Sequence, residues 1–412
     1  MEGRLTMSYR ELEDGFLVTL ALIVSSQLLV ILISLISNQF RRQRKLSITN
    51  QPPVESVIDG NQITIYTYGM DFYHALLRDI TQAKDIICIE SFIWKDDAVG
   101  QQIKELLAKK AREGVTVYVV FDAFANLVVP RPFKQFSPDI HLYRYRAWQR
   151  FLDLFDPRRL ARDHRKLAII DRTISYVGGF NIGELYGRKW RDTHVRIEGS
   201  SSHNLFAAFA DFWNAQAHKL PKLKTERASL SPYIRPYVNN PQRILFPIRS
   251  MYIEAIDLAK EHIFLTTPYF VPDRVVLSAL IDAADRGVQV SLLVPERSNH
   301  LLADWLARTY FTDCLKRGIR IYLYQGAMIH AKTATVDGKW TTIGTANLDR
   351  LSLFGNHEIN VEFFSEEVAT HMEGMFEYDL KACRELSLDE WNRRPMTQKL
   401  GELVLSPLWP FL

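Results

Sequence analysis

One motif occurs twice in this chain, and the repeat constrains the fold more than any other feature. The pattern H-x-K-x4-D-x6-G-x2-N matches residues 164–181 and again residues 330–347, at an offset of 166 positions with no insertion. The members of the two copies are His164, Lys166, Asp171, Gly178 and Asn181, then His330, Lys332, Asp337, Gly344 and Asn347. The same offset relates two acids further along, Asp192 and Glu358. Such a repeat indicates a duplicated structural unit.

The segments upstream of the two motifs also resemble one another. "AKDIICIESFIW" (83–94) parallels "AKEHIFLTTPYF" (259–270), and "AREGVTVYVVFD" (111–122) parallels "ADRGVQVSLLVP" (284–295). Each pair reads as strand, helix, glycine and buried strand, which is the order of an α/β layer fold. We therefore predict two α/β halves with mixed sheets, related by a pseudo-two-fold axis. The predicted boundaries are 55–215 for the first half, 216–243 for a linker rich in Pro and charge, and 244–412 for the second half.

The N-terminal region contains a candidate membrane anchor. Residues 16–36 are 21 residues without a charge, which fits the roughly 20 that a helix needs to cross a bilayer. The residues before this run are acidic, so a retained anchor is favoured over a cleaved signal peptide. The basic "RRQRK" at 41–45 predicts that the following side is cytoplasmic and touches anionic headgroups. We thus expect residues 1–45 to be a single-pass anchor with a basic juxtamembrane segment.

Each motif places a histidine and a lysine at the head of an apolar run. Because side chains alternate along a strand, His164 and Lys166 point the same way, and the second copy repeats this. Asp171 and Asp337 fall on the opposite parity beside hairpin-turn signals, which favours a scaffold role over direct chemistry. As members of the motif they still enter the candidate catalytic set. Gly178, Gly179 and Gly344 would allow close backbone approach at the ends of the return strands.

One half supplies one histidine, one lysine and one asparagine, which is half of a phosphoryl-transfer site. Two halves together give Lys166, Asn181, Lys332 and Asn347 as phosphate-binding groups. A neutral imidazole can attack phosphorus while an imidazolium protonates the leaving oxygen. Asp192 and Glu358 are candidates for orienting the histidines, with Asp192 tuning His164. This chemistry requires no metal or other cofactor, and the sequence shows no acidic cluster with metal-ligand spacing.

The paired H-x-K-x4-D blocks resemble the twin HKD motifs of the phospholipase D superfamily, across residues 55–412. The "ESFIW" and "TPYFVPD" strand ends, "NLDRLSL" and the tail "SPLWPFL" are similar to bacterial cardiolipin synthases. The resemblance implies two phospholipase D-like sandwich halves at a bacterial cell membrane. It also implies a phosphohistidine intermediate and transfer of a phosphatidyl group between two phosphatidylglycerol molecules, with glycerol released. In that family the nucleophile usually comes from the first motif, which implies His164 as nucleophile and His330 as acid and then base.

Four features depart from the family pattern or bear on the substrate. Many such synthases have two N-terminal spans where this chain shows one, and "GGFN" faces "GTAN" across the repeat, so the half-sites are expected to bind phosphate unequally. Residues 146–164 interleave aromatics with arginines and read either as an interfacial helix or as a core helix. Glu90 ends an apolar strand, where it binds substrate hydroxyls or serves the structure.

Several functions share these motifs. Phosphatidyl transfer that makes cardiolipin is the leading one. Hydrolysis of phospholipid to phosphatidic acid, or cardiolipin synthesis with a phosphatidylethanolamine donor, uses the same residues. A nuclease would carry a strongly basic groove, and a net charge of +4 over 412 residues argues against a nucleic-acid partner. A lipid-binding scaffold without activity has no need of both complete motifs.

Overall fold

The computed structural model describes residues 50–147, 156, 159–225 and 231–405. The predicted anchor at 1–45 lies outside the described residues, as do most of the segment 148–158 and the tail from 406. Within the described ranges, no helix combines the length and the apolar character needed to cross a bilayer.

The first half is built on a mixed sheet with β3, β4 and β5 parallel and the remaining main strands antiparallel. Its strands in spatial order are β1 (Val54–Ile58), β2 (Asn61–Tyr68), β8 (Trp190–Glu198), β7 (Ile174–Gly178), β6 (Leu167–Ile170), β3 (Ile86–Ser91), β4 (Thr116–Asp122) and β5 (Ile140–Tyr145). β3 and β4 are buried on both faces, which explains their nearly continuous apolar sequence.

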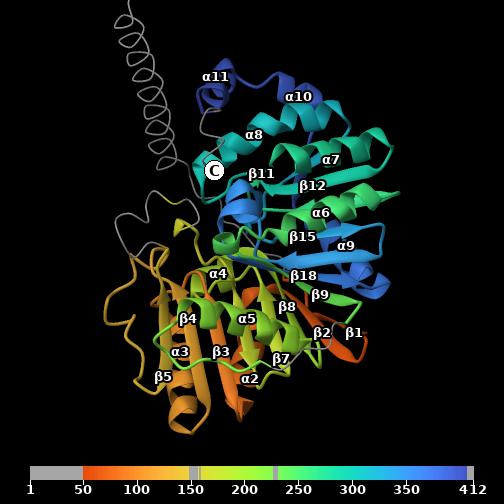
Figure 1. The fold of residues 1–412 in the computed structure, drawn as a ribbon. Coiled ribbons are helices and arrows are strands. Elements are labelled where there is room, and N and C mark those ends of the chain that lie inside the picture. Colours follow the sequence, from red (N-terminus) through yellow and green to blue (C-terminus); the bar gives the residue numbers. More distant parts are fainter. Residues whose placement is uncertain (1–49, 148–155, 157–158, 226–230, 406–412) are drawn as a thin grey trace, which may run out of the picture.

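The second half repeats this arrangement. Its sheet runs β19 (Cys383–Leu386), β13 (Arg320–Tyr324), β12 (Gln289–Pro295), β10 (His262–Thr266), β15 (Thr333–Val336), β16 (Trp340–Gly344), β18 (Glu358–Phe364) and β9 (Ile234–Asn239). The short strands β11 (Phe270–Val271) and β17 (Leu348–Asp349) pair apart from it. The prediction of two α/β halves with mixed sheets is thereby confirmed (Figure 1).

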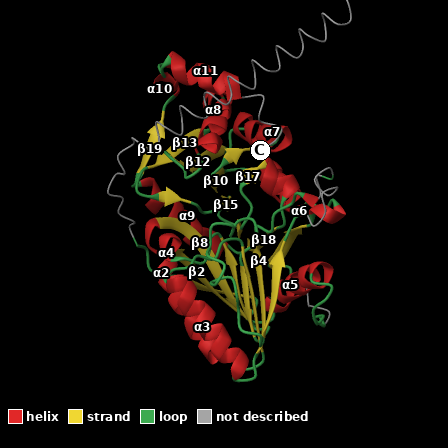
Figure 2. Ribbon diagram, turned by 90° about the vertical axis from the view of Figure 1, so that its left-hand side faces the viewer, coloured by secondary structure: helices red, strands yellow, loops and turns green. Residues whose placement is uncertain are grey.

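Helices cover the faces of both sheets. The helices of the described residues are α2 (Gly69–Gln82), α3 (Ala98–Arg112), α4 (Glu184–Lys189), α5 (Ser202–Gln216), η3 (Pro241–Arg243), α6 (Pro247–Leu258), α7 (Arg274–Asp285), α8 (Leu301–Lys316), η4 (Leu351–Gly355), α9 (Glu366–Leu380), α10 (Leu388–Asn392) and α11 (Met396–Leu405). Figure 2 shows α2 and α3 on one side of the first sheet and α5 on the other. The corresponding helices α3 and α7 begin alike, because Asp97 and Asp273 each accept backbone N–H groups of the first turn.

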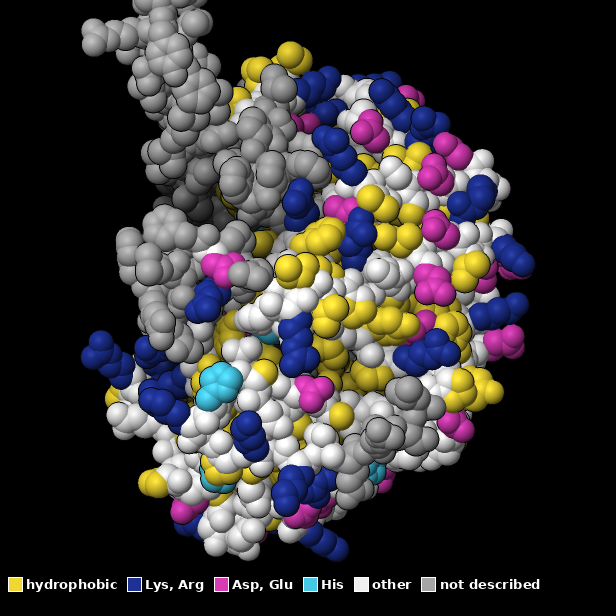
Figure 3. All heavy atoms as spheres, viewed as in Figure 1, with side chains coloured by type: hydrophobic (Ala, Val, Ile, Leu, Met, Phe, Trp, Pro, Cys, Tyr) yellow, Lys and Arg dark blue, Asp and Glu magenta, His cyan; other side chains and the backbone are white. Residues whose placement is uncertain are grey.

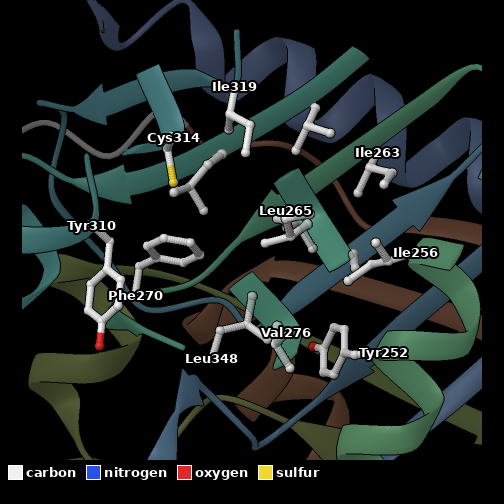
Figure 4. Close-up of a cluster of buried hydrophobic side chains, with 14 of the residues drawn as sticks. Tyr252, Ile256, Ile263, Leu265, Phe270, Val276, Tyr310, Cys314, Ile319 and Leu348 are labelled. Carbon is white, nitrogen blue, oxygen red and sulfur yellow. The ribbon is translucent and has the colours of Figure 1, made fainter. Parts of the chain in front are cut away.

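Side chains alternate between the two faces of the first sheet, and each face packs into a different apolar core. On β3, Ile87 and Ile89 face the cluster under α2 and α3, whereas Ile86 and Cys88 face the opposite cluster. That opposite cluster also contains Ile359 and other residues of β18 and α9, so one apolar core joins the two halves. A separate core fills the second half between β10, α6, α7 and α8, where Figure 4 shows the packing around Leu265 and Phe270.

The predicted linker requires a correction. β9 lies inside the range 216–243 and pairs antiparallel with β18 along its whole length. It occupies the place in the second sheet that β2 occupies beside β8 in the first. The second half therefore begins with β9, before position 244. Pro236 sits within β9, and this is possible because β9 is an edge strand.

Candidate active site

The two motif histidines lie where the halves meet, just ahead of β6 and β15. Each is held by a backbone bond to the other half: the His164 N–H donates to the His357 oxygen at 3.0 Å, and the His330 N–H donates to the Arg191 oxygen at 2.7 Å. The lead-in strand β14 (Met328–Ile329) extends the first sheet by pairing with β8. Asp163 pairs in parallel with His357 in the corresponding way. Each motif is thus entered through a strand contact with the opposite half.

This exchange decides which acid reaches which histidine. Nδ1 of His164 lies 2.8 and 3.0 Å from the two carboxylate oxygens of Glu358. Nδ1 of His330 lies 2.6 Å from Oδ2 of Asp192. The expectation that Asp192 tunes His164 is therefore wrong, because each acid serves the histidine of the other half. The Nε2 atom of each imidazole is the one left for chemistry.

The two acids are supported differently. The Thr345 hydroxyl donates to Glu358 at 2.5 Å. At the equivalent position stands Gly179, where an added Cβ would lie 1.9 Å from Oδ1 of Asp192. Asp192 instead accepts the backbone N–H of Thr193 at 2.8 Å. The difference between "GGFN" and "GTAN" therefore matches the two acids: the glycine leaves room for Asp192, and the threonine hydroxyl bonds to Glu358.

Both lysines are buried beside these pairs. Lys166 is 2% exposed and Lys332 is 1% exposed, and each Nζ donates to the backbone oxygen of its own histidine. Burial lowers the pKa of Lys166 to about 8 and that of Lys332 to about 7, although Glu358 and Asp192 favour the charged forms. A phosphate anion would favour those charged forms further, so the site is suited to binding one.

The imidazoles and Asp192 are also shifted by burial. Burial lowers the pKa of His164 to about 4 against the raising effect of Glu358. Burial lowers the pKa of His330 well below its usual value, and both lysines act in the same direction. The pKa of Asp192 is raised to about 6 by burial. Burial thus favours the neutral form of both imidazoles, each of which has a carboxyl group at Nδ1.

The two asparagines of the motif differ in their partners. Oδ1 of Asn181 accepts the backbone N–H of Ile93 at 3.1 Å, so its amide nitrogen is the part available to a phosphate. Oδ1 of Asn347 is buried and has no hydrogen-bond partner among the described residues. The Asn347 side chain also bonds to Asp349, a carboxyl whose pKa burial raises to about 6. The half-sites are therefore unequal here too.

The aspartates of the motif lie away from the histidines. Asp171 follows β6 at its far end and accepts the backbone N–H groups of Lys84, Asp85 and Ile86. Asp337 accepts those of Lys260, Glu261 and His262 in the same way. Both have positive φ values near 50°, as in tight turns. Their inclusion in the candidate catalytic set is therefore corrected. Both residues bind the backbone N–H groups of a neighbouring segment and so hold their turns in place.

Glu90 belongs to the structure rather than to a hydroxyl-binding site. Its carboxylate forms a two-point ion pair with Arg165, at 2.8 and 2.6 Å, in the interior of the first half. Asp163 lies beside this pair, 3.9 Å from the Arg165 guanidinium. Burial and the nearby Glu90 raise the pKa of Asp163 well above its usual value.

Sequence reasoning missed the aromatic residues around the histidines. The ring of Phe92 meets His164 edge to face, with centroids 4.7 Å apart. Trp190 and Tyr269 lie beside His330, at 4.9 and 6.4 Å between centroids. Trp190 immediately precedes the residue whose oxygen holds His330, and Phe92 follows β3 directly, so both stand near segments that the repeat had marked. Among the described residues, no group of three His, Cys, Asp or Glu side chains is placed to hold a metal ion.

Comparison with known proteins gives matches to both halves of the chain. The family model described as "Cardiolipin synthase, PLD-like domain" matches residues 76–213 and 252–380, one match in each half. A cardiolipin synthase of Clostridium perfringens is 31% identical over 371 residues, covering 85% of this chain and 77% of the relative. The major cardiolipin synthase ClsA of Bacillus subtilis is 32% identical over 374 residues, covering 86% and 76%.

Solved structures share the fold at lower identity. A phosphatidylserine synthase of Haemophilus influenzae superposes with a TM-score of 0.65 at 15% identity, covering 88% of this chain and 95% of that one. A polyphosphate kinase of Porphyromonas gingivalis gives 0.57 at 14% identity, covering 89% and 57%. These likenesses concern the duplicated framework alone.

Proposed function

The chain belongs to the cardiolipin synthase PLD-like domain family, and on that premise we propose that it is a phosphatidyltransferase making cardiolipin and glycerol from two phosphatidylglycerol molecules. The observation that carries the proposal is the crossed pair of acid–histidine contacts, His164 with Glu358 and His330 with Asp192, beside two buried lysines. This arrangement supplies two imidazoles and two cations for one phosphate.

In the first step Nε2 of His164 attacks the phosphorus of one phosphatidylglycerol. A nitrogen–phosphorus bond forms and the bond from phosphorus to the glycerol oxygen breaks. His330 gives its Nε2 proton to that oxygen, and glycerol leaves. The substrate's negative charge raises the pKa of the buried His330, so the imidazolium that must donate this proton forms when substrate binds.

In the second step a glycerol hydroxyl of another phosphatidylglycerol attacks the same phosphorus. His330, now neutral, takes the hydroxyl proton, and the nitrogen–phosphorus bond breaks to regenerate His164. Glu358 and Asp192 hold the imidazoles through Nδ1 in both steps. Lys166 and Lys332 offset the charge on the phosphate oxygens as the transition state forms.

The proposal places this chemistry at a bacterial cell membrane. Residues 1–45 would anchor the chain through one span, with the two halves on the cytoplasmic side, as the uncharged run and the basic cluster after it indicate. Added protease in sealed, right-side-out vesicles should then leave the two halves intact. Cleavage of the halves from outside would contradict the cytoplasmic orientation.

Purified enzyme incubated with phosphatidylglycerol alone tests the reaction. Cardiolipin and glycerol should appear in equal amounts, His164→Ala should make neither, and the exposed-site control His218→Ala should match the unchanged enzyme. Phosphatidic acid as the main product would make the chain a hydrolase. Cardiolipin that forms only after phosphatidylethanolamine is added would assign a different donor.

A further inference from the structure

A basic cavity opens beside the chain that leads into the first motif. It has a volume of about 940 Å³ and lies where β4, β5 and the loop 123–139 meet. Its cationic lining residues are Arg131, Lys134, Arg144, Arg146 and Arg162, and the rest of its described lining contains no acid. Figure 3 shows Lys and Arg side chains gathered at the left edge, over the loop between β4 and β5.

The hydrogen bonds that Lys134 and Arg144 make in this cavity do not neutralise the charges of these two side chains. Lys134 donates to the Asn126 backbone oxygen at 3.0 Å, and Arg144 donates to the Lys134 backbone oxygen at 2.7 Å. Neither acceptor carries a formal charge. Across the part of the chain that the structure describes, no carboxylate forms an ion pair with Arg131, Arg144 or Arg146. Several cations around one hollow create a positive potential that attracts anions.

The second half has a cavity in the corresponding region, and its lining mixes acids with arginines. It has a volume of about 510 Å³ and is lined by Glu296, Asp304 and Glu390 as well as by arginines. Arg384 pairs with Glu296 at 3.4 Å and also with Glu390. A cavity whose described lining holds cations and no acid is therefore a property of the first half and not of the duplicated fold.

The loop that borders the basic cavity carries apolar side chains in solvent. Phe124 is 50% exposed, Leu127 is 65% exposed and Val128 is 83% exposed. The Arg162 guanidinium lies 3.8 Å above the Phe124 ring, so cation and apolar surface are in direct contact. Apolar groups beside a cluster of cations are typical of surfaces that enter the headgroup region of a bilayer.

We propose that the basic cavity and the apolar loop at 124–128 form a docking site for the anionic phospholipid headgroups of a bilayer. The cations contact lipid phosphates, and the loop enters the interface between headgroups and acyl chains. Arg162 stands two residues before His164, and Asp122 at the end of β4 accepts the Asp163 N–H at 3.1 Å. Docking here would hold the first motif next to the bilayer surface. The inference rests on the proposed function only for the presence of a membrane nearby.

A fluorescent probe on the loop tests this without any turnover. The full chain carries Val128→Cys in a Cys383→Ser background, with Cys88 and Cys314 left as buried thiols, and is labelled with a polarity-sensitive dye. It is reconstituted in phosphatidylcholine vesicles with or without an equal part of phosphatidylserine. The dye should shift to the blue, and lipid-borne quenchers should reach it, only in the anionic vesicles. Added salt should reduce the effect.

The matched variants remove equal charge from two places. Arg131→Glu, Arg144→Glu and Arg146→Glu together should lower the ratio of docked to undocked protein by on the order of 100-fold. Lys84→Glu, Lys260→Glu and Lys339→Glu, exposed at strand ends remote from the histidines, should leave it unchanged. Equal dye signals in neutral and anionic vesicles would overturn the proposal, as would equal losses in both triple variants. A response to an oligonucleotide but not to vesicles would overturn it as well.

Discussion

The two halves bring the same types of side chain to the candidate site, but different residues pack beneath them. Behind His164 the first half buries Arg165 with Glu90 and Asp163, and the Arg165 guanidinium also lies 4.4 Å from the Phe212 ring. In the second half the residues at the same offset are Ala331 and Ile329, which belong to an apolar cluster. Histidine, lysine and acid thus recur at the site, while the layer beneath is ionic in one half and apolar in the other.

This comparison shows which constraints duplication leaves in place. The groups at the candidate site must match in type because the proposed reaction needs both sets. The layer beneath has only to fill space and satisfy its own polar atoms, and a buried ion pair or an apolar cluster can do so. The two motif histidines should therefore respond alike to loss of the imidazole and differently to changes beneath them.

The largest effect should fall on both halves equally. His164→Ala and His330→Ala are each expected to lower turnover of phosphatidylglycerol by on the order of 10⁴-fold or more, because each removes a group that no neighbour replaces. Cardiolipin assays measure this, with thermal melting as the check on folding. A variant that keeps near-normal turnover while folded would break the two-histidine scheme.

The ionic support should matter in the first half only. Arg165→Met leaves Glu90 charged and buried, and we expect it to cost about 3–5 kcal/mol of unfolding free energy. Glu90→Met combined with Arg165→Met should recover most of that loss, since neither charge remains. Urea unfolding compares the two variants. Equal stability of the single variant and the parent would mean that the pair contributes nothing.

The crossed acids should tolerate a change of side-chain length poorly. Glu358→Asp withdraws the carboxylate from His164 and from the Thr345 hydroxyl, and we expect turnover to fall by about 10- to 100-fold. Asp192→Glu forces a longer side chain against Gly179 and should cost a similar factor. Steady-state kinetics on both variants sharpens the comparison. A loss in only one of them would show that one pair sets the rate.

The pH profile should reveal the shifted groups. As pH rises through about 7 to 8, Lys332 and then Lys166 lose their protons and phosphate affinity falls. As pH falls through about 6, Asp192 gains a proton and no longer accepts from Nδ1 of His330. The profile of kcat/KM should therefore be bell-shaped, with each limb falling up to tenfold per pH unit. Lys332→Arg should move the alkaline limb upward, and an unmoved limb would assign it to another group.

The smallest effect should be structural and equal in the two halves. Asp171→Asn and Asp337→Asn each weaken three backbone contacts at a turn, which should cost on the order of 1 kcal/mol. Turnover by the folded fraction should stay close to that of the parent, as measured by kcat corrected for the folded amount. A large fall in kcat without a fall in stability would return these aspartates to the chemistry.

Much of the fold and of the candidate site could be predicted from the sequence, because the repeat shows which residues occupy equivalent positions in the two halves. The α/β halves and the His–Lys pairs follow from patterns that lie within a single segment. The crossing of Asp192 to His330 does not, because an offset of 166 is the same whether an acid serves its own half or the other. The crossing depends on β14, a strand of two residues that is too short to produce a recognisable alternation of apolar and polar residues in the sequence.

Two other misses have equally local causes. Pro236 and its charged neighbours made β9 look like a linker, since a proline is excluded from the interior of a sheet but not from its edge. Glu90 stands at a strand end, where a carboxylate suits a ligand or a partner equally well. Only the fold brings Arg165 to it across 75 positions of sequence.

The crossed contacts also determine when the protein can begin to act as it folds. His164 meets Glu358 across 194 positions of sequence, and His330 meets Asp192 across 138. Closing loops of that length comes late, after local helices and neighbouring strands have formed. A chain emerging from the ribosome can form strands β1 to β8 of its first sheet and still lack any assembled acid–histidine pair. Lipid chemistry is thus withheld from every partly folded form and starts only when the halves have docked.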